Sequence, residues 1–490
     1  MTTTSTHIAI IGAGIGGLSA AIASASSGQH ASIYEQLDRP GGKMGELHEA
    51  GFRWDTGPSV ITMRHVFERL FRMAGRDFAD YVELVPLNPI TRYFWRDGLT
   101  LDAVANEDAM CAQIAAFAPV DADHYRRFLG YVRQLHDLIG EPFLYRNQPG
   151  LKDLFKLPVR DVLRIDALRT MHQAVQAYFR DPHLVQLFDR FATYNGSSPY
   201  QAPATLNVIA HVEMALGAWY PRGGVYAIAE GMARLAAELG VEMHYNSPVQ
   251  KIITQSGRAT GLRLHNGETI TAEAIIANAD VTHTYEHLLP ASNRQRRWLE
   301  PSCSGFVLLL GVRRQFATLA HHNILFSDDY PHEFDDIFKR KIPPSDPTIY
   351  ICITSKTDPG HAPDGCENWF VLINAPYLTE KYDWVVDADN YATHIKAILQ
   401  QRLGLQEADI LLERRITPAD LQNKYGGHKG AIYGFSSNTK MAAFLRPNNR
   451  ARDVKRLYFA GGSAHPGGGV PLVTLSGMAA ATCLQEDLAG

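Results

Sequence analysis

The stretch HIAIIGAGIGGLSAAIA, residues 7–23, decides the fold of this chain. Residues 7–11 are β-prone and lack acidic and basic groups other than the first histidine, as expected of a parallel strand buried on both faces. Gly12, Gly14 and Gly17 follow with the spacing G-x-G-x-x-G, and small apolar residues of helical character come next. Such glycines permit a tight turn, close approach of the backbone to a pyrophosphate, and contact between helix and strand. The motif alone is equally typical of an ordinary turn before a helix.

The next strand favours a dinucleotide. Residues 31–34 are followed by Glu35, about 20 residues after the glycines, where this fold places an acid on a ribose hydroxyl. An acid there disfavours a 2′-phosphate, so NADP is not expected. A second glycine pair, Gly41 and Gly42, precedes Lys43, where an NAD dehydrogenase would enter its next crossover helix. A second close-approach loop with positive charge favours a longer ligand such as FAD.

Two distant segments are expected to return to the same sheet. Residues 220–280 predict a helix ending at Gly240, strands at 241–245 and 249–253, a hairpin around Asn266–Gly267, and a buried strand at 274–277. Residues 457–484 predict a strand, a glycine-rich loop and a helix from residue 470. The positive N-terminal end of that helix would stabilise negative charge on a flavin ring.

Composition limits the other possibilities. The chain has 490 residues, 46% hydrophobic and 20% charged, with a net charge of −4, which is globular and gives no general attraction for nucleic acid. Its five cysteines contain no CxxC and no His/Cys spacing that suits zinc, so no metal site is predicted, and the set fits a reducing, cytoplasmic compartment. No run approaches 18 apolar residues, so no membrane-spanning helix is expected.

Several longer motifs resemble one family. The sequence resembles the bacterial-type phytoene desaturases and their carotenoid dehydrogenase and oxidase relatives, within the flavin amine-oxidase superfamily. The likeness runs nearly end to end, and it is most specific in WYPRGG and HPGGGVP. The motifs that carry it are IIGAGIGGLSAA, YEQLDRPGGKM, FRWDTGPSVIT (52–62), WYPRGGVYAIAEGM (219–232), NADVTHTYEHLLP (278–290), LAHHNILF (319–326), FLRPNNR (444–450) and AGGSAHPGGGVP.

This resemblance implies non-covalent FAD, a polyene hydrocarbon as substrate and peripheral contact with a membrane. It also implies an α/β fold with a Rossmann-type, glutathione-reductase-like FAD domain and an inserted substrate domain of mixed sheet and helices. Position by position, the expected cofactor contacts are Gly12, Gly14, Gly17, Glu35, Gly41, Gly42, Lys43, Asp55, Gly57, Pro58, Val249, Asp280, Gly461, Gly469, Val470 and Pro471. The start of the last helix, VPLVTLSGMAAA, differs from the common phytoene desaturase ending, which leaves the exact reaction step open.

The expected FAD domain comprises residues 1–100, 215–285 and 445–490, and the substrate domain residues 101–214 and 286–444. Residues 106–211 are helical in pattern and rich in basic and bulky apolar groups. The segment 151–165 has the composition of an interfacial helix, so we expect the membrane-contacting part here.

The expected reaction is desaturation, in which FAD takes a hydride from a C–C single bond and a proton leaves the neighbouring carbon. A conjugated polyene disperses the charge, so a tuned base is not obligatory; Asp55, Glu213 and His465 are the candidates. Oxygen or a quinone would reoxidise the flavin. Oxidation of terminal methyls to aldehydes and a non-enzymatic flavin-binding escort protein remain as alternatives, and an amine oxidase is less favoured because no aromatic pair precedes the last strand.

Overall fold

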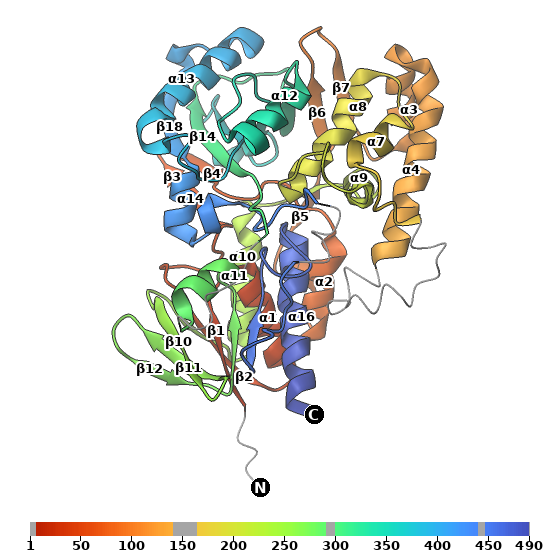
Figure 1. The fold of residues 1–490 in the computed structure, drawn as a ribbon. Coiled ribbons are helices and arrows are strands. Elements are labelled where there is room, and N and C mark those ends of the chain that lie inside the picture. The colour runs from red at the N-terminus through yellow and green to blue at the C-terminus, as the bar shows by residue number, and fades with distance from the viewer. Residues whose placement is uncertain (1–5, 141–163, 291–298, 440–445, 490) are drawn as a thin grey trace.

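The computed structural model describes residues 6–140, 164–290, 299–439 and 446–489 (Figure 1). Its lower half in that view is built on a five-stranded sheet whose neighbouring strands are all parallel. The strand order β19-β13-β1-β2-β9 brings together three separated segments of the chain. The strands are β1 (His7–Ile11), β2 (His30–Tyr34), β9 (Glu242–His244), β13 (Ala274–Ala277) and β19 (Leu457–Phe459). The glycine stretch therefore belongs to a doubly wound nucleotide-binding sheet, as predicted.

Helices pack closely on this sheet because their contact residues are small. Helix α1 (Ile15–Ser26) packs against α16 (Val470–Ala489) and α10 (Tyr226–Glu238), with α2 (Arg64–Met73) beside α16. A Cβ on Gly477 of α16 would lie 2.3 Å from the carbonyl oxygen of Gly16, so this contact needs glycine. Ser19 Oγ donates to the carbonyl oxygen of Thr474 at 2.7 Å and joins the same two helices. The C-terminal helix is thereby fixed against the first helix.

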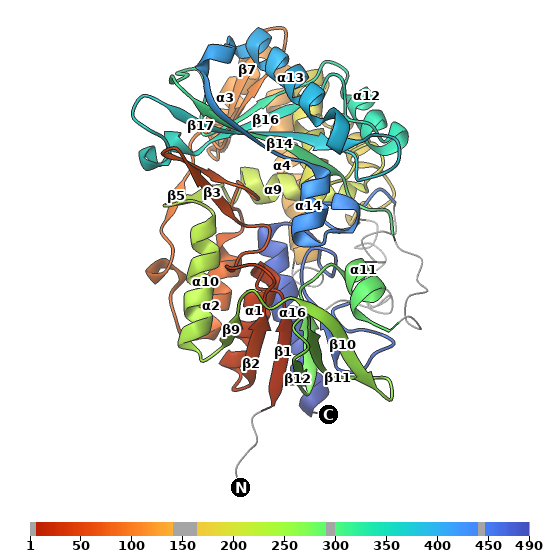
Figure 2. The ribbon, with the colours of Figure 1, turned by 90° about the vertical axis from the view of Figure 1, so that its left-hand side faces the viewer.

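A second, seven-stranded sheet forms the core of the upper half. Its order is β18-β14-β17-β16-β15-β6-β7, antiparallel except for the pair β15–β6. The 90° view in Figure 2 places β14, β16 and β17 above the parallel sheet. The strands are β6 (Thr91–Phe94), β7 (Thr100–Ala103), β14 (Ser304–Val312), β15 (His322–Leu325), β16 (Ile349–Ile353), β17 (Glu367–Ala375) and β18 (Ile410–Ile416). Strand β14, between β18 and β17, is buried at every position, as its uninterrupted apolar sequence predicts.

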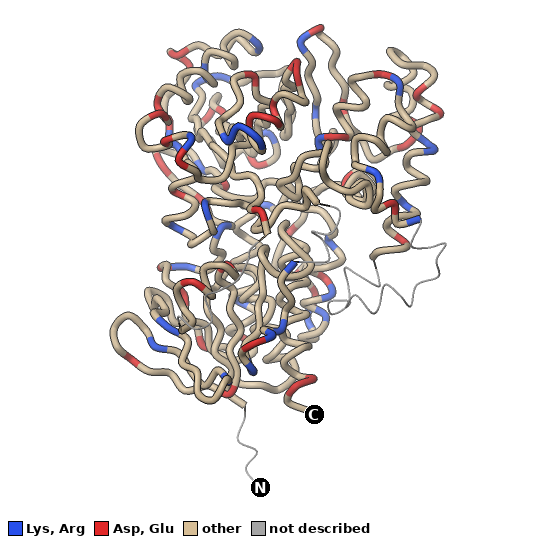
Figure 3. The backbone as a smooth tube through the Cα atoms, in the orientation of Figure 1, with Lys and Arg blue, Asp and Glu red and all other residues tan. Residues whose placement is uncertain are grey.

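Helices of the upper half lie on both sides of this sheet. The group at the upper right of Figure 1 has its own apolar core, centred on Phe128, Phe179 and Phe188. Its members are α3 (Glu107–Phe117), α4 (Pro119–Ile139), α7 (Met171–Gln176), α8 (Pro182–Asp189) and α9 (Val208–Met214), and α12 (Tyr330–Asp335) contributes to the same core. Helix α13 (Trp384–Leu403) packs in a separate core with β14, β16 and β17, and α14 (Pro418–Tyr425) contacts α13. Basic and acidic residues are interspersed along the chain in both halves (Figure 3).

Smaller elements join the two halves. They are the hairpin β3 (Glu46–Glu49) with β4 (Phe52–Asp55) and the pair β5 (Leu84–Pro86) with β8 (Trp219–Pro221). The short helix α11 (Val281–His283) and the three-stranded sheet β10 (Val249–Gln255), β11 (Arg258–Leu264) and β12 (Thr269–Thr271) lie beside the parallel sheet in the lower half. The predicted hairpin around Asn266–Gly267 is confirmed as β11–β12.

Residues 91–100 belong to the seven-stranded sheet, although the sequence analysis assigns them to the FAD domain. Strand β6 in this stretch pairs in parallel with β15. Of the predicted interfacial helix 151–165, residues 151–163 lie outside the described part of the chain. Among the described helices, none combines the length and apolar composition that crossing a bilayer requires. The remaining division into FAD and substrate domains stays a prediction.

Candidate functional site

The first glycine loop ends β1 and begins α1 with free backbone donors. Gly12 has φ +90°, and Gly14 precedes the helix without any side-chain cap. No acidic residue occupies the first turn, so its N–H groups and the positive helix end are available to an anion. A Cβ on Gly17 would lie 2.0 Å from the carbonyl oxygen of Gly12, so Gly17 serves the helix–strand contact. The loop has the geometry of a pyrophosphate cradle.

Glu35 follows β2 and closes this loop from the side. Its Oε2 accepts from the N–H of Ala13 at 2.6 Å and its Oε1 from that of Leu37 at 2.9 Å. Burial raises the pKa of Glu35, while these backbone donors oppose the rise. The carboxylate is thus fixed beside the first glycine loop, at the place where a ribose would lie.

The second glycine loop is joined directly to the first. Gly41 donates to the carbonyl oxygen of Ala13 at 2.9 Å, and Gly41 and Gly42 both have positive φ. Lys43 Nζ donates to the carbonyl oxygens of Ala431 and Ile432 at 3.1 and 3.0 Å. Burial lowers the pKa of Lys43, and the carboxylate of Asp280 opposes that shift. The partly buried Lys43 therefore links the second glycine loop to residues 431–432.

The segments after β13 and β19 lie beside the first glycine loop, on the side away from the second glycine loop. Asn278, directly after β13, donates from Nδ2 to the carbonyl oxygen of Ala460 at 3.1 Å. Its Oδ1 would lie 2.7 Å from a Cβ on Gly14, so Asn278 stands between the first and last glycine loops. Ser463 Oγ accepts from the N–H of Val281 at 2.9 Å. Both hydrogen bonds join residues that lie 182 positions apart in the sequence.

A cavity of about 970 Å³ extends from these loops to the seven-stranded sheet. Near the sheet its lining includes the apolar residues Val307, Phe370 and Leu372 and the polar residues Arg190 and Tyr194. The predicted cofactor contacts that line it are Gly12, Gly14, Glu35, Gly41, Gly42, Lys43, Gly57, Pro58, Val249, Asp280, Gly461, Gly469, Val470 and Pro471. The loops thus converge on a single space, as an extended dinucleotide requires.

The residues present fit FAD. Two helix N-termini, those of α1 and α16, reach the cavity at Gly14 and Val470, and both first turns lack acidic side chains. One is suited to the pyrophosphate and the other to negative charge on the flavin ring. A side chain at Gly14 would take up space beside Asn278, which explains glycine at the cradle.

The predicted base candidates do not line the cavity. Asp55 is buried and held by Arg53 at 2.8 Å, while Tyr220 OH and the N–H of Val225 donate to it at 2.8 and 2.9 Å. His465 is 7% exposed and lies outside the lining; its carbonyl oxygen accepts from Asn449 at 3.0 Å. Both residues are embedded in the supporting structure.

Glu213 also lies behind the wall. Its Oε1 is 2.6 Å from Nη2 of Arg190, and Tyr194 OH donates to its other oxygen. Burial disfavours the charge of Arg190, but the carboxylate outweighs this and raises the pKa of Arg190. Arg190 also donates from Nε to Tyr93 OH at 2.8 Å. Glu213 therefore keeps a buried guanidinium charged and in position at the cavity wall.

Sequence reasoning missed this polar group and the sheet residues of the wall. Arg190 and Tyr194 belong to a helical segment, RFATYN, that reads as ordinary core. Tyr350 faces the cavity from β16; its OH bonds Ser59 Oγ at 2.7 Å and His322 Nδ1 at 2.8 Å. The histidine pair of LAHHNILF could have drawn attention to this wall. Burial lowers the pKa of His321 to about 3 and holds that of His322 well below its ordinary value, so both imidazoles are neutral.

Comparison with known proteins gives consistent matches. Residues 15–485 match the family model described as flavin containing amine oxidoreductase. The chain is 38% identical to 4,4'-diapolycopene oxygenase of Methylomonas sp over 98% of both chains. It is 36% identical to 4,4'-diaponeurosporene oxygenase of Staphylococcus aureus (strain MW2) over 96% of both chains. The solved structure of cyclohexylamine oxidase from Brevibacterium oxydans IH-35A is similar in fold, with a TM-score of 0.62, 17% identity and coverage of 99% and 100%.

Proposed function

The chain belongs to the flavin containing amine oxidoreductase family, and from this premise we propose that it oxidises the end of an acyclic carotenoid. FAD is its cofactor, and the protein is an oxidoreductase. The full-length identity of 36–38% to two proteins named as carotenoid oxygenases carries the proposal for the substrate and for oxygenation.

The apolar and polar residues that line the cavity support this substrate. Val307, Phe370 and Leu372 offer an apolar surface along which a polyene would bury its chain. Arg190 also lines the cavity and presents guanidinium N–H groups there, whereas the O–H of Tyr194 is donated to Glu213. Such N–H donors suit an oxygen atom introduced at the end of the chain, because a carbonyl oxygen accepts from N–H groups.

The proposed reaction converts a terminal methyl to an aldehyde. With dioxygen as oxidant the balance is R–CH₃ + O₂ → R–CHO + H₂O, so the methyl carbon gives up four electrons and dioxygen takes them. Bound FAD supplies the capacity to accept hydride equivalents and pass them to oxygen. The chain's own residues position the polyene, exclude water and stabilise charge.

The residues have separate tasks in this proposal. The N–H groups at the start of α16 would stabilise negative charge on the ring, and Gly469 leaves room for close approach. Lys43 would hold the loop containing Ala431 against the cofactor. Arg190, kept charged by Glu213, would orient the oxidised end of the substrate. Asp55 and His465, embedded behind the wall, would support the fold rather than transfer protons.

Desaturation of a C–C bond is the second candidate, because the same apolar wall would bind the same polyene and hydride transfer needs no further group. An amine substrate fits less well. An amine is a cation at neutral pH, and the described residues of the wall near the seven-stranded sheet include Arg190 without a free carboxylate. A flavin-binding escort protein would hold the cofactor without turnover.

Pigment analysis separates these candidates. We would express the chain in hosts that make lycopene or 4,4'-diapolycopene, beside a Gly17→Val variant that cannot form the cradle. Product masses that gain one oxygen and lose two hydrogens, with aldehyde reactivity, are expected. Loss of two hydrogens alone would establish desaturation instead, and unchanged pigments with flavin-loaded protein would favour the escort protein.

Peripheral membrane contact and a cytoplasmic location belong to the same proposal, since a carotenoid must be drawn from a bilayer. Flotation of the purified flavoprotein with anionic and neutral vesicles tests the contact. Oxygen consumption, compared with reduction of a soluble quinone, identifies the electron acceptor.

A further inference from the structure

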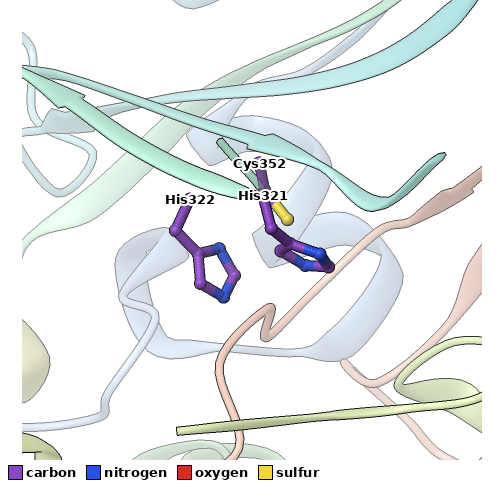
Figure 4. Close-up of side chains that lie close together, drawn as sticks. All are labelled: His321, His322 and Cys352. Atoms are coloured by element: carbon purple, nitrogen blue, oxygen red, sulfur yellow. The ribbon is translucent and has the colours of Figure 1, made fainter. Parts of the chain in front are cut away.

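Two imidazoles and a thiol meet behind the cavity wall. Figure 4 shows His321, His322 and Cys352 gathered beside β15 and β16. One ligand-capable atom of each residue lies within 4.8 Å of those of the other two. Strand pairing creates this arrangement, because His322 is opposite Cys352 in the antiparallel register. The ring of His321 meets that of His322 edge-on, with centroids 4.4 Å apart.

The cluster is buried and incompletely hydrogen-bonded. The exposed fractions of His321, His322 and Cys352 are 6%, 0% and 1%. Nδ1 of His321 bonds Thr357 Oγ1 at 2.6 Å, and Nδ1 of His322 bonds Tyr350 OH at 2.8 Å. Nε2 of both rings is buried and has no hydrogen-bond partner among the residues that the structure describes. Leaving such an atom unsatisfied costs about 1–3 kcal/mol, so two of them side by side call for an explanation.

We propose that His321, His322 and Cys352 form a binding site for a thiophilic transition metal ion, Zn²⁺ or Cu⁺. Neutral imidazole and thiolate are the ligands that these ions prefer. Bonds of about 2.0–2.3 Å place tetrahedral ligand atoms about 3.3–3.8 Å apart, so the side chains need to close by about 1 Å.

The hydrogen bonds around the cluster are of the kind that orient metal ligands. A ligating histidine is held in its tautomer and orientation by a bond from its other nitrogen. Thr357 and Tyr350 provide such partners in the described structure. If an ion binds through Nε2, these two bonds remain in place. The ion would then satisfy both atoms that the protein leaves unpaired.

The surrounding charges favour a cation. Arg53 lies between Glu46 and Asp55, at 3.0 and 2.8 Å, so this trio carries one net negative charge. Asp55 is close enough to act electrostatically on Cys352. A divalent ion with one thiolate carries one net positive charge and would balance the trio. Arg190, on the side of His322, is already paired with Glu213.

The site would support the cavity without entering it. Ile324 and Tyr350, the next in-register pair along β15 and β16 on the same face, line the cavity. An ion on His322 would fix this corner of the sheet and, through it, the position of Tyr350 OH. The proposal does not depend on which reaction the flavin performs. Sequence spacing gave no sign of it because its ligands are joined by strand pairing.

Metal content of the flavin-loaded protein tests the site. The protein would be purified without chelator from cultures supplied with Zn²⁺ or copper, and metal, flavin and protein would be measured on the same sample. Cys352→Ser removes the thiolate, and Cys303→Ser is the matched control, since Cys303 is another buried free cysteine. Co²⁺ serves as a spectroscopic probe, because a thiolate ligand gives an intense charge-transfer band.

We expect about one ion per chain in wild type and in Cys303→Ser, and a loss of at least about tenfold in affinity in Cys352→Ser. The cobalt–thiolate band should vanish in that variant alone. Equal metal content in Cys352→Ser and wild type, or no uptake of any of the three ions by wild type, overturns the proposal. If Cys352→Ser fails to fold, X-ray absorption of the wild-type protein decides. One sulfur at about 2.3 Å with nitrogen at about 2.0 Å supports the site, and a shell without sulfur excludes it.

Discussion

Arg190 and Glu213 form an ion pair with 2.6 Å between Nη2 and Oε1, and only the arginine lines the cavity. The carboxylate that the sequence offered as a base is therefore the counter-ion of a cavity residue. Because both side chains are buried, neither can recover hydration if its partner is lost. The ion pair therefore holds the Arg190 side chain in one position on the cavity wall.

Glu213→Gln should destabilise the protein strongly. The change leaves the Arg190 guanidinium buried with hydrogen bonds but no counter-charge, at a cost of about 3 kcal/mol in the free energy of unfolding. Urea unfolding measures it. Glu83→Gln is the matched control, because the Glu83–Arg222 pair is exposed and its loss should cost about 0–1 kcal/mol. Equal effects of the two changes would contradict the assigned role.

Gly17→Ala should prevent flavin binding. Its Cβ would meet the carbonyl oxygen of Gly12 at 2.0 Å, which forces α1 away from β1 and deforms the cradle. Flavin absorbance per chain and the unfolding temperature would both fall. Gly130→Ala, in α4 with no neighbouring atom of the described chain within 4 Å, should retain full flavin and raise the free energy of unfolding by about 0.5–1 kcal/mol. Normal flavin content in Gly17→Ala would refute the helix–strand contact.

Asp55→Asn distinguishes a structural role of Asp55 from a role as the base of the reaction. We expect lower stability, because Arg53 loses its closest counter-ion, while the flavin-loaded fraction keeps its turnover within about threefold. A base in the reaction would instead cost about 100-fold or more in kcat. Turnover per bound flavin distinguishes the two, with Tyr220→Phe as a control that removes one hydrogen bond to the same carboxylate.

Glu333 should make stability depend on pH. Burial raises its pKa from 4.5 to about 7, despite hydrogen bonds from Thr348 and Ser327 at 2.7 and 2.8 Å. The folded protein thus holds this proton more tightly than the unfolded chain. Its stabilising contribution is complete below pH 4.5 and is lost as pH rises through about 7.

Glu333→Gln keeps the shape of the side chain and cannot ionise. The difference in unfolding free energy between wild type and this variant should therefore shift against wild type by up to about 1.4 kcal/mol per pH unit between pH 5 and 7. Urea unfolding at several pH values measures that difference. A constant difference over this range would show that Glu333 is ionised at an ordinary pKa.

The local pattern of the sequence sufficed for the nucleotide-binding half. Strand, glycines, helix and acid occur within residues 7–35, and each step follows from the conformational needs of a few neighbouring residues. The hairpin at Asn266–Gly267 was predictable for the same reason. The glycine loops near both ends of the chain predicted one extended ligand, because each is followed by a helix whose N-terminus can bind an anion.

Only the tertiary structure decided which polar residues face the cavity. Asp55, Glu213 and His465 carry suitable chemistry, yet ion pairs and packing place them behind the wall, while Arg190 from an unremarkable helical segment lies on it. The meeting of His322 with Cys352 likewise depends on the register of two strands. Sequence periodicity states which face of an element is buried, but hydrogen bonds between distant strands determine which residues then become neighbours.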